Sequence, residues 1–273
     1  MRLVVLYEEL AGYLVACINR FAEKYNAQVH IFRKELNEVA PFDFNLADNL
    51  KIYDRKNLDD EHFLEIIEKI KPDGIFCGGW IYKPYLKLAK KYRNEIPVIL
   101  GFDNKWENSI KQNTLSLFCK RYFRRHFSSC WVPGDKQAEF ARRIGFSKNK
   151  IFQNAYSADV DLFENFYKNS LAGKRQNIPT RFIFSGRYTH AKGIDLLWQA
   201  FIELQKENPS DWELWCLGTG DVEPIIHPKI KHFGFVQPKD MEKYISETGV
   251  FVLPSTFEPW GVAVHEFASA GFP

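Results

Sequence analysis

The sequence lacks several features that would assign it to a special class of protein. Its five cysteines form no C-x-x-C pair, and their odd number does not suit a complete disulfide framework. No stretch approaches the roughly 18 apolar residues of a membrane span, and the apolar start meets Glu8 and Glu9 too early for a signal peptide. A net charge of +3 is too weak to indicate nucleic acid. We therefore expect a reduced cytoplasmic protein with small core cysteines and no nucleic-acid partner.

Three short motifs are incomplete matches to the nucleotide-binding or metal-binding motifs that they resemble. Gly218-Thr219-Gly220 has Glu223 where a dinucleotide fingerprint needs its third glycine. His265-Glu266 is not the start of a zinc-protease motif, because Ser269 stands where the second histidine must be. Asp159-Val160-Asp161 matches a D-x-D metal motif only in three letters, and its position favours turn and helix-cap roles.

The composition that is present is that of an ordinary globular protein. The chain has 273 residues, of which 45% are hydrophobic and 26% charged, so it can bury a sizeable core in one large or two ordinary domains. Aromatic residues reach 16%, which fits either many buried rings or a stacking site and does not choose between them.

Short apolar runs alternate with helical patterns along the whole chain, which predicts α/β architecture with parallel sheets. The expected domains are 1–165 and 178–273, with a linker in the weakly periodic segment 154–177. The expected strands are 3–6, 29–32, 74–77, 98–101, 130–132, 181–185, 212–217, 231–235 and 249–253. The expected helices are 12–24, 62–70, 85–91, 115–127, 135–144, 193–206, 239–246 and 261–270.

Two glutamates flank the start of the last expected helix. Pro254 and Ser255 end a buried strand at the carboxyl edge of the sheet, where open α/β proteins bind ligands. Gly261 and Val262 lie where that helix begins, and its free N–H groups favour an anion. Glu258 precedes the helix and Glu266 lies inside it, about 10 Å further along the backbone. They would contact different parts of one extended ligand; two solvated surface glutamates are the alternative.

A basic pair follows the first strand of the second domain. Arg187 comes directly after the strand end, and Lys192 precedes the next helix. Arginine suits bidentate contact with phosphate and lysine supplies a compact charge, so the pair predicts a phosphate site. A solvated basic loop is the alternative.

Together these segments resemble the GT-B glycosyltransferases of family 4, the glycosyl transferases group 1. The resemblance covers residues 181–273, and the segment 154–163 is similar to the inter-domain segment of the family, with Ala155-Tyr156 in place of its glycine. The residues that carry it are Ser185-Gly186-Arg187, Lys192-Gly193, Leu217-Gly218-Thr219-Gly220, Phe233-Gly234-Phe235, Val252-Leu253-Pro254-Ser255, Glu258-Pro259-Trp260-Gly261, Glu266 and Ala270-Gly271.

The resemblance implies two Rossmann-like domains facing a cleft, and transfer of a sugar from a nucleotide-diphosphate sugar with retention of configuration. It implies that Glu258 lies by the sugar and acts in catalysis, that Glu266 binds the ribose hydroxyls, and that Arg187 and Lys192 bind the diphosphate. Backbone N–H groups at Gly261 and Val262 would add contacts at the helix start. The family needs no bound metal and no cofactor besides its donor substrate.

The N-terminal half would bind the acceptor, a glycan or a lipid-linked molecule, and there the resemblance is only one of pattern. Asp103 and Asn104 follow an expected strand end, where Asp103 could take the proton of an acceptor hydroxyl. An Asx turn that ends the strand explains the same residues.

The densest basic run lies in the expected helix 115–127. Arg121, Arg124 and Arg125 gather near one face, while Phe123 and Phe127 are at helical spacing on another. Such a helix can rest on anionic lipid at the inner face of a membrane and present lipid-linked acceptors. A solvated helix with a buried aromatic stripe is the alternative.

Family members continue past the Ala-Gly-x-Pro corner with which this sequence ends, so we expect an incomplete second domain and a missing C-terminal segment or companion chain. A self-associating, weakly active protein would follow from the uncovered apolar edge. The alternative function is a partner-dependent subunit that binds nucleotide or glycan without catalysis. A glycosidase fits less well, because its two carboxyls should lie within about 5–9.5 Å across one bond.

Overall fold

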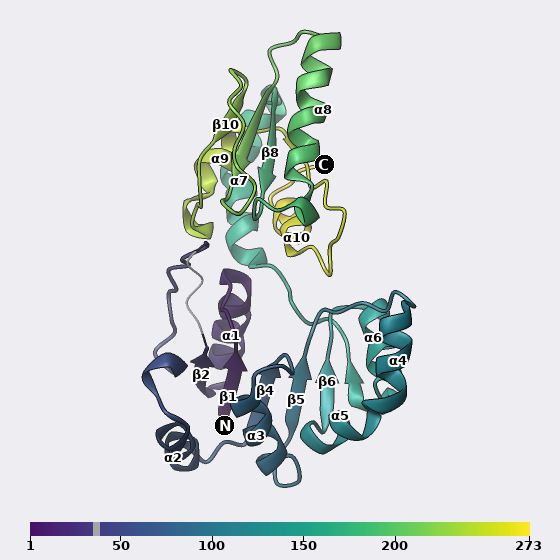
Figure 1. Ribbon diagram of the computed structural model, residues 1–273. Helices are drawn as coiled ribbons and strands as arrows, with labels where there is room; N and C mark the ends of the chain where they lie inside the picture. The colour runs from purple at the N-terminus through teal and green to yellow at the C-terminus, as the bar shows by residue number, and fades with distance from the viewer. Residues whose placement is uncertain (35–38) are drawn as a thin grey trace. The chain divides into compact units, whose positions relative to one another are not determined.

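The computed structural model describes residues 1–34 and 39–273 and divides the chain into two compact units (Figure 1). Unit 1 holds the first part of the chain and residues 44–157. Unit 2 holds residues 158–273 and the described part of the segment 37–43. The boundary lies between Ser157 and Ala158, and the segment in which the sequence predicts a linker forms the helix α7 (Val160–Gln176) of unit 2.

Unit 1 is a seven-stranded parallel sheet in the order β3-β2-β1-β4-β5-β6-β7. Its strands are β1 (Arg2–Tyr7), β2 (Gln28–Arg33), β3 (Leu50–Asp54), β4 (Gly74–Gly78), β5 (Val98–Gly101), β6 (Ser129–Trp131) and β7 (Ile151–Phe152). Its helices are α1 (Gly12–Tyr25), α2 (Asp60–Ile70), α3 (Lys83–Tyr92), α4 (Ile110–Phe118), α5 (Lys120–His126) and α6 (Asp135–Arg143), with short 3₁₀ turns at Arg55–Asn57 and Lys148–Lys150.

Alternation along the strands divides the core of unit 1 into two layers. Val4 and Leu6 of β1 point toward the cluster that includes α2, α3, α5 and α6, whereas Val5 between them points toward α1. This is the period of two that a strand buried on both faces requires. Cys77, Cys119 and Cys130 lie buried here as free thiols, and Cys216 does so in unit 2, as predicted for small core residues, whereas Cys17 is only half-buried.

Unit 2 is a four-stranded parallel sheet in the order β10-β9-β8-β11. Its strands are β8 (Arg181–Ser185), β9 (Glu213–Leu217), β10 (Ile230–His232) and β11 (Val250–Phe251). Besides α7, its helices are α8 (Ile194–Glu207), α9 (Glu242–Glu247) and α10 (Val262–Ser269), with 3₁₀ turns at His190–Lys192 and Pro238–Asp240.

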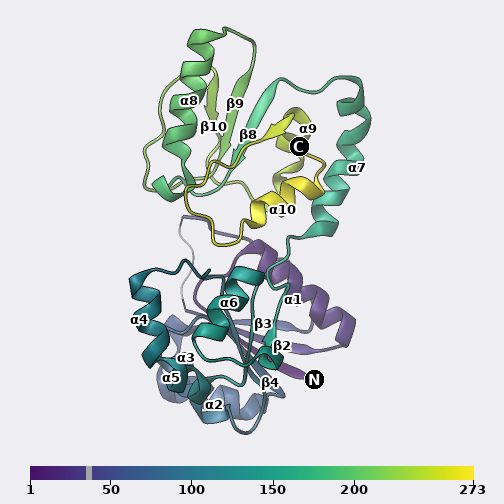
Figure 2. The ribbon, with the colours of Figure 1, turned by 90° about the vertical axis from the view of Figure 1, so that its right-hand side faces the viewer.

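The same alternation builds both faces of the second sheet. Ile183 and Trp215 pack with α7, α9 and α10, while the next residues, Phe184 and Cys216, pack with α8. Figure 2 shows α8 on one side of the strands and α7 with α10 on the other. The predicted α/β class with two parallel sheets is therefore confirmed.

The structure corrects three details of the sequence prediction. The expected helix 115–127 is two helices, α4 and α5, that meet at Cys119. The strands β3 and β7 were not predicted; β7 is only two residues long, too short to show a periodic pattern.

None of the helices in the described part of the chain is long and apolar enough to cross a membrane.

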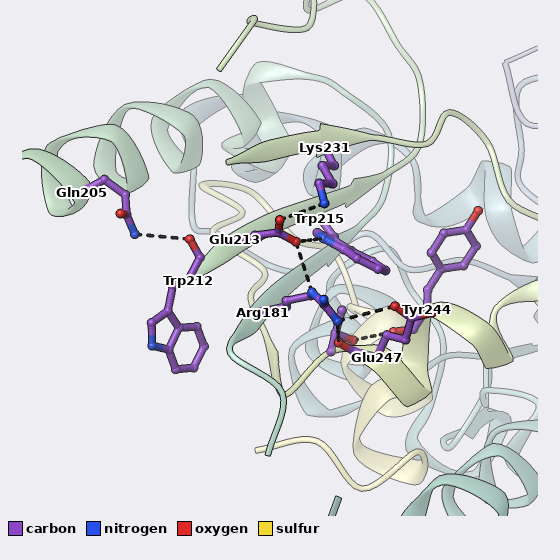
Figure 3. A network of polar contacts seen from close by, with 9 residues as sticks. Arg181, Gln205, Trp212, Glu213, Trp215, Lys231, Tyr244 and Glu247 are labelled. Carbon is purple, nitrogen blue, oxygen red and sulfur yellow. Dashed lines mark hydrogen bonds and ion pairs between the residues drawn. The ribbon is translucent and has the colours of Figure 1, made fainter. Parts of the chain in front are cut away.

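A polar network ties the amino ends of the unit 2 strands together (Figure 3). Glu213 accepts hydrogen bonds from Arg181 Nε at 3.1 Å and Trp215 Nε1 at 2.8 Å, and Lys231 Nζ lies 2.8 Å from its other oxygen. Arg181 also donates to the backbone oxygen of Glu247 at the end of α9. Burial opposes ionisation of Glu213, but the hydrogen bonds from Lys231 and Trp215 outweigh it and lower its pKa.

We predict that Glu213→Gln destabilises unit 2 at neutral pH by about 1 kcal/mol, a figure discounted for partial solvent exposure of the pair. Because the folded-state pKa is lowered, this stabilisation is present above the ordinary glutamate pKa and is lost as the pH falls through the folded value. The difference in melting temperature from the natural protein should therefore be clear at pH 7 and should shrink steadily as the pH is lowered below the ordinary glutamate pKa of about 4.3. Glu203→Gln, at an exposed position of α8, is the matched control; an equal loss there would contradict the role of the network.

Candidate functional site

The strand order of unit 2 reverses direction between β8 and β11. From β8 the chain steps outward to β9 and β10 on one side and returns to β11 on the other. At such a reversal the loops after the two central strands leave the sheet in opposite directions and open a space at the carboxyl edge, where ligands of α/β proteins bind. Arg187 and Lys192 follow β8, and Glu258 follows β11, so three predicted residues belong to the two loops at this point.

The loop after β8 is held by a buried tyrosine. The hydroxyl of Tyr188 lies 3.2 Å from the backbone oxygen of Cys216 and 3.1 Å from Nδ1 of His232, and its ring is fully buried. Thr189 then caps the 3₁₀ turn His190–Lys192, because its Oγ1 accepts a hydrogen bond from Lys192 N at 3.3 Å. The turn thereby fixes the backbone from which the Lys192 side chain extends.

Gly193 allows the two loops to touch. Its φ of +66° lies in the left-handed region, and a Cβ at this position would be 2.3 Å from the backbone oxygen of Pro254. Phe257 N also donates to Ala191 O at 3.2 Å. A side chain at position 193 would therefore push apart the loops that carry the basic and acidic residues.

Lys192 and Glu258 form an ion pair across these loops. Lys192 Nζ lies 2.6 Å from Glu258 Oε2, and Ser255 Oγ donates to the same oxygen at 3.0 Å. The side chains are 27% and 23% exposed, so the pair is reachable from solvent but partly desolvated. An ammonium has three N–H donors, and one bond to Glu258 leaves two for an anionic ligand. The structure thus brings together two residues that the sequence assigns to one ligand.

The start of α10 lies beside this pair. Gly261 has a φ of +80° and is the residue before Val262, the first residue of the helix. A Cβ on Gly261 would be 3.2 Å from Cγ of Glu258, so the glutamate side chain lies against the helix start. The unpaired N–H groups of the first turn and its dipole make this position favourable for negative charge.

Glu266 lies one turn further along α10 in a different environment. Burial raises the pKa of Glu266 to about 7, and the negative charge of Asp159 adds to the rise. Asp159 caps α7, where its Oδ1 accepts a hydrogen bond from Leu162 N at 3.3 Å, which confirms the predicted cap role. The influence of Asp159 on Glu266 was not predicted, since the two residues are more than 100 positions apart in the sequence.

Arg187 is exposed in the loop that bears Lys192. The loop after β9 approaches this segment closely, because a Cβ on Gly218 would be 1.9 Å from the backbone oxygen of Gly186. Gly218, with a φ of +136°, is therefore required where these two loops meet, and a Cβ on Gly220 would be 2.3 Å from the backbone oxygen of Tyr188. These contacts explain the glycines of the Gly218-Thr219-Gly220 motif without a dinucleotide.

Asp103 belongs to unit 1. It follows β5, is partly buried, and its negative charge contributes to raised pKa values of Tyr7 and Tyr156, after the larger effect of burial. Tyr7 ends β1, and Tyr156, one of the two residues that stand in place of the glycine of the resembled family, has a left-handed φ of +59°. The sequence reasoning did not include either tyrosine in the site; the non-glycine residue at 156 was the signal that could have indicated it.

The three arginines of α5 differ in the structure. All three are exposed, and Arg124 also donates from Nε to Gly145 O at 2.9 Å. Phe123 and Phe127 are only 2% and 1% exposed, so the aromatic stripe lies in the core, as the alternative interpretation predicted. The lipid contact of the arginines stays a prediction.

One open cavity of unit 2 does not have Arg187, Lys192 or Glu258 among its lining residues. It has a volume of about 730 Å³ and is lined by residues of 233–244, including Phe233, Phe235, Gln237 and Tyr244. The candidate site is therefore assigned from charge and from the position of the loops at the strand ends. In the described part of the chain, His, Cys, Asp and Glu nowhere gather in a group of three that could hold a metal.

Comparison with known proteins shows which family unit 2 resembles. Residues 179–273 match the family described as "Glycosyl transferases group 1", which confirms the resemblance for unit 2. The chain is similar to the 2-deoxystreptamine N-acetyl-D-glucosaminyltransferase of Niallia circulans, with 26% identity over 190 residues, 62% of this chain and 46% of that protein. The chain spans less than half of the length of the curated relatives it matches.

Solved structures show that the fold is of the GT-B type. Sucrose-phosphate synthase of Thermosynechococcus elongatus superposes with a TM-score of 0.67 at 14% identity, over 100% of this chain and 80% of that one. HepE of Anabaena, solved in complex with UDP-glucose, gives a TM-score of 0.66 at 14% identity, over 100% and 79%. At such identities the likeness concerns the fold alone.

We predict that Glu266→Gln stabilises unit 2 at alkaline pH. An acid with a raised folded-state pKa is protonated in the folded protein between its unfolded value and about 7, so the stability of the natural protein falls as the pH rises through that window. The glutamine variant should melt at a similar temperature at about pH 5 and gain about 2 kcal/mol relative to the natural protein at about pH 8. Glu207→Gln at the exposed end of α8 should change neither value. A constant difference at both pH values would refute the raised pKa.

Proposed function

We propose that this chain transfers a sugar from a nucleotide-diphosphate sugar to a hydroxyl group of a glycan or lipid-linked acceptor, with retention of configuration. Its membership of the glycosyltransferase group rests on the match of residues 179–273. The observation that carries the proposal is the Lys192–Glu258 pair at the strand reversal of unit 2. It combines a cation for the diphosphate with a carboxylate for the sugar, at the edge where ligands of α/β proteins bind.

The donor would lie along the two loops and the start of α10. The diphosphate would accept hydrogen bonds from Arg187, from the two remaining Lys192 donors and from the N–H groups at Gly261 and Val262. Glu258, whose carboxylate contacts Lys192, would accept hydrogen bonds from sugar hydroxyls. Glu266, deeper in α10, would bind the ribose hydroxyls, which can both donate and accept and thus suit a carboxyl with a pKa of about 7.

The reaction would develop negative charge on the leaving diphosphate and would release a proton from the acceptor hydroxyl. As the bond between the anomeric carbon and the diphosphate breaks, negative charge grows on the diphosphate, and Arg187 and Lys192 offset it. The acceptor oxygen would form the new bond to the anomeric carbon on the face from which the diphosphate leaves, which retains the configuration. A base would take the proton of the hydroxyl, and Asp103 is the candidate for this role from the sequence. This route uses no metal ion, since the two cationic side chains supply the positive charge.

A screen of UDP-, GDP- and ADP-sugars for thermal stabilisation tests donor binding directly, because a ligand that binds only the folded protein raises its melting temperature. The stabilising donor is then incubated with the pure protein, and release of nucleoside diphosphate is measured with and without candidate acceptors. Stabilisation without transfer or hydrolysis would favour the partner-dependent binding subunit. Absence of stabilisation by every sugar nucleotide would contradict the donor site itself.

We predict that Arg187→Ala and Lys192→Ala each weaken binding of the nucleoside diphosphate by about 1.5–3 kcal/mol, the usual contribution of a charge-assisted contact. Isothermal titration with the free nucleoside diphosphate measures this loss. Lys206→Ala removes an exposed cation of α8 as the matched control and should bind like the natural protein. If both loop variants keep full affinity, the diphosphate site lies elsewhere.

We predict that Glu258→Gln lowers kcat more than it lowers affinity for the nucleoside diphosphate. The glutamine keeps the volume of the side chain but loses the charge that faces Lys192 and the sugar, so the effect falls on the reacting group. Steady-state kinetics combined with titration of the free nucleotide separates the two. A collapse of nucleotide affinity with kcat retained would mean that Glu258 binds the nucleotide instead of the sugar.

A further inference from the structure

A histidine and an aspartate form a hydrogen-bonded pair beside the candidate donor loops. His190 Nδ1 lies 2.9 Å from Asp195 Oδ2, and the bond joins the 3₁₀ turn after β8 to the first turn of α8. The His190 side chain is 79% exposed, and within the described part of the chain its Nε2 has no hydrogen-bond partner. A carboxylate on one ring nitrogen orients an imidazole and leaves the other nitrogen for a ligand.

The position of His190 makes it part of the site at the strand reversal. It lies between Arg187 and Lys192 in the loop after β8. Thr256 Oγ1, in the loop after β11 that also carries Glu258, donates to the backbone oxygen of His190 at 3.4 Å. His190 therefore belongs to the contact between the two loops, although the resemblance to the glycosyltransferases assigns it no role.

The charges of these loops favour a further cation. The positive charge of Lys192 is already opposed by Glu258 at 2.6 Å, so this pair as a whole is neutral. A diphosphate that joins a sugar to a nucleoside carries two negative charges, and Arg187 supplies one positive charge. A protonated imidazole supplies another, and its N–H at Nε2 is a charge-assisted donor for a phosphate oxygen.

Asp195 can hold this imidazole because the helix start shares its negative charge. The hydrogen bond from His190 lowers the pKa of the Asp195 carboxyl, and smaller contributions come from the backbone N–H groups of Asp195 and Leu196. These N–H groups belong to the first turn of α8, which is the positive end of the helix dipole. The carboxylate thus fixes the ring without taking up Nε2.

We propose that His190 is a third side chain that binds the diphosphate of the sugar nucleotide, through Nε2 in its protonated form, and that Asp195 is its positioning residue. Histidine changes its charge between about pH 5 and 8, so donor affinity falls as the pH rises through that range. The inference rests on the proposed function, because it uses the same donor site, but it concerns binding and is measured without transfer. The charged groups on the segments around the imidazole are Asp195 on α8, Arg187 and Lys192 in the same loop, and Glu258 after β11.

The experiment titrates the whole chain with UDP-glucose, GDP-mannose and ADP-glucose at about pH 5.5 and about pH 8.5, on either side of the histidine range. Sugar nucleotides are the probes because they lack the terminal phosphate that ionises near pH 6 in a free nucleoside diphosphate. Since the pKa of Glu266 is about 7, all variants are made in the Glu266→Gln background, which is the parent protein here. The parent should bind its best probe about fivefold more weakly at the higher pH, as for one exposed charge-assisted contact.

Three variants test the two roles. His190→Gln should remove the pH dependence and bind at both pH values as weakly as the parent does at the higher one. His190→Arg keeps a cation throughout and should bind tightly at both. Asp195→Ala leaves the imidazole unheld and should lose at least about half of the pH dependence although His190 is present.

A second pair in unit 1 provides matched controls. His62 Nδ1 lies 2.8 Å from Asp59 Oδ2 at the start of α2, the same arrangement of histidine, aspartate and helix start. His62→Gln and Asp59→Ala should therefore bind every probe like the parent at both pH values. Melting temperatures show which variants fold, and if Asp195→Ala does not, the two His190 variants decide the outcome.

The possible results separate this inference from the proposed function. A parent whose affinity does not change with pH, a pH dependence that survives in His190→Gln, or an equal loss in the His62 control would each overturn the role of His190 while the donor site stands. If none of the three sugar nucleotides binds at either pH, the donor site and this inference fail together. Absence of sugar transfer with the pH-dependent binding intact would count against the proposed function alone.

Discussion

The close approach of the loops after β8 and β11 is the constraint on which the candidate donor site depends. Gly193 makes it sterically feasible, since a Cβ there would meet the backbone of Pro254 at 2.3 Å. The ion pair between Lys192 and Glu258 then holds the two loops by charge at 2.6 Å. Both features lie at the point where the strand order of the sheet reverses, so topology, backbone geometry and electrostatics act on the same few residues.

Interactions elsewhere in unit 2 hold the strands and helices that carry these loops. The Glu213 network joins the amino ends of the strands, while Phe163 and Phe267 bring α7 and α10 together in the core. Because α10 is packed in this way, Glu266 is partly buried near Asp159 and titrates close to neutral pH. Packing therefore gives the two glutamates different chemistry: Glu258 is compensated by a cation, and Glu266 is not.

Unit 1 combines a conventional core with an unconventional surface. Phe123 and Phe127 of α5 are buried as a core stripe should be, whereas the neighbouring helix α4 turns leucine, isoleucine and phenylalanine outward. The contrast shows that helical periodicity alone does not say which face is buried. Hydrogen bonds from Gln112 to the preceding backbone decide the orientation of α4, and no pattern of hydrophobicity encodes them.

The sequence by itself determined the α/β class and the strand and helix alternation of unit 2, and it indicated Lys192, Glu258 and Glu266 as candidates. These signals are local: buried β runs, glycines at turns and charges at helix starts. Only the tertiary structure decided which of these residues contact one another. Residues 50 to 150 positions apart interact in the Lys192–Glu258 pair, in the effect of Asp159 on Glu266, and in the effect of Asp103 on the two tyrosines. The helix α7 forms where a linker was expected, because its aromatic face packs against α9 and α10. Contacts between distant residues are set by packing and sheet order, which a single sequence does not display.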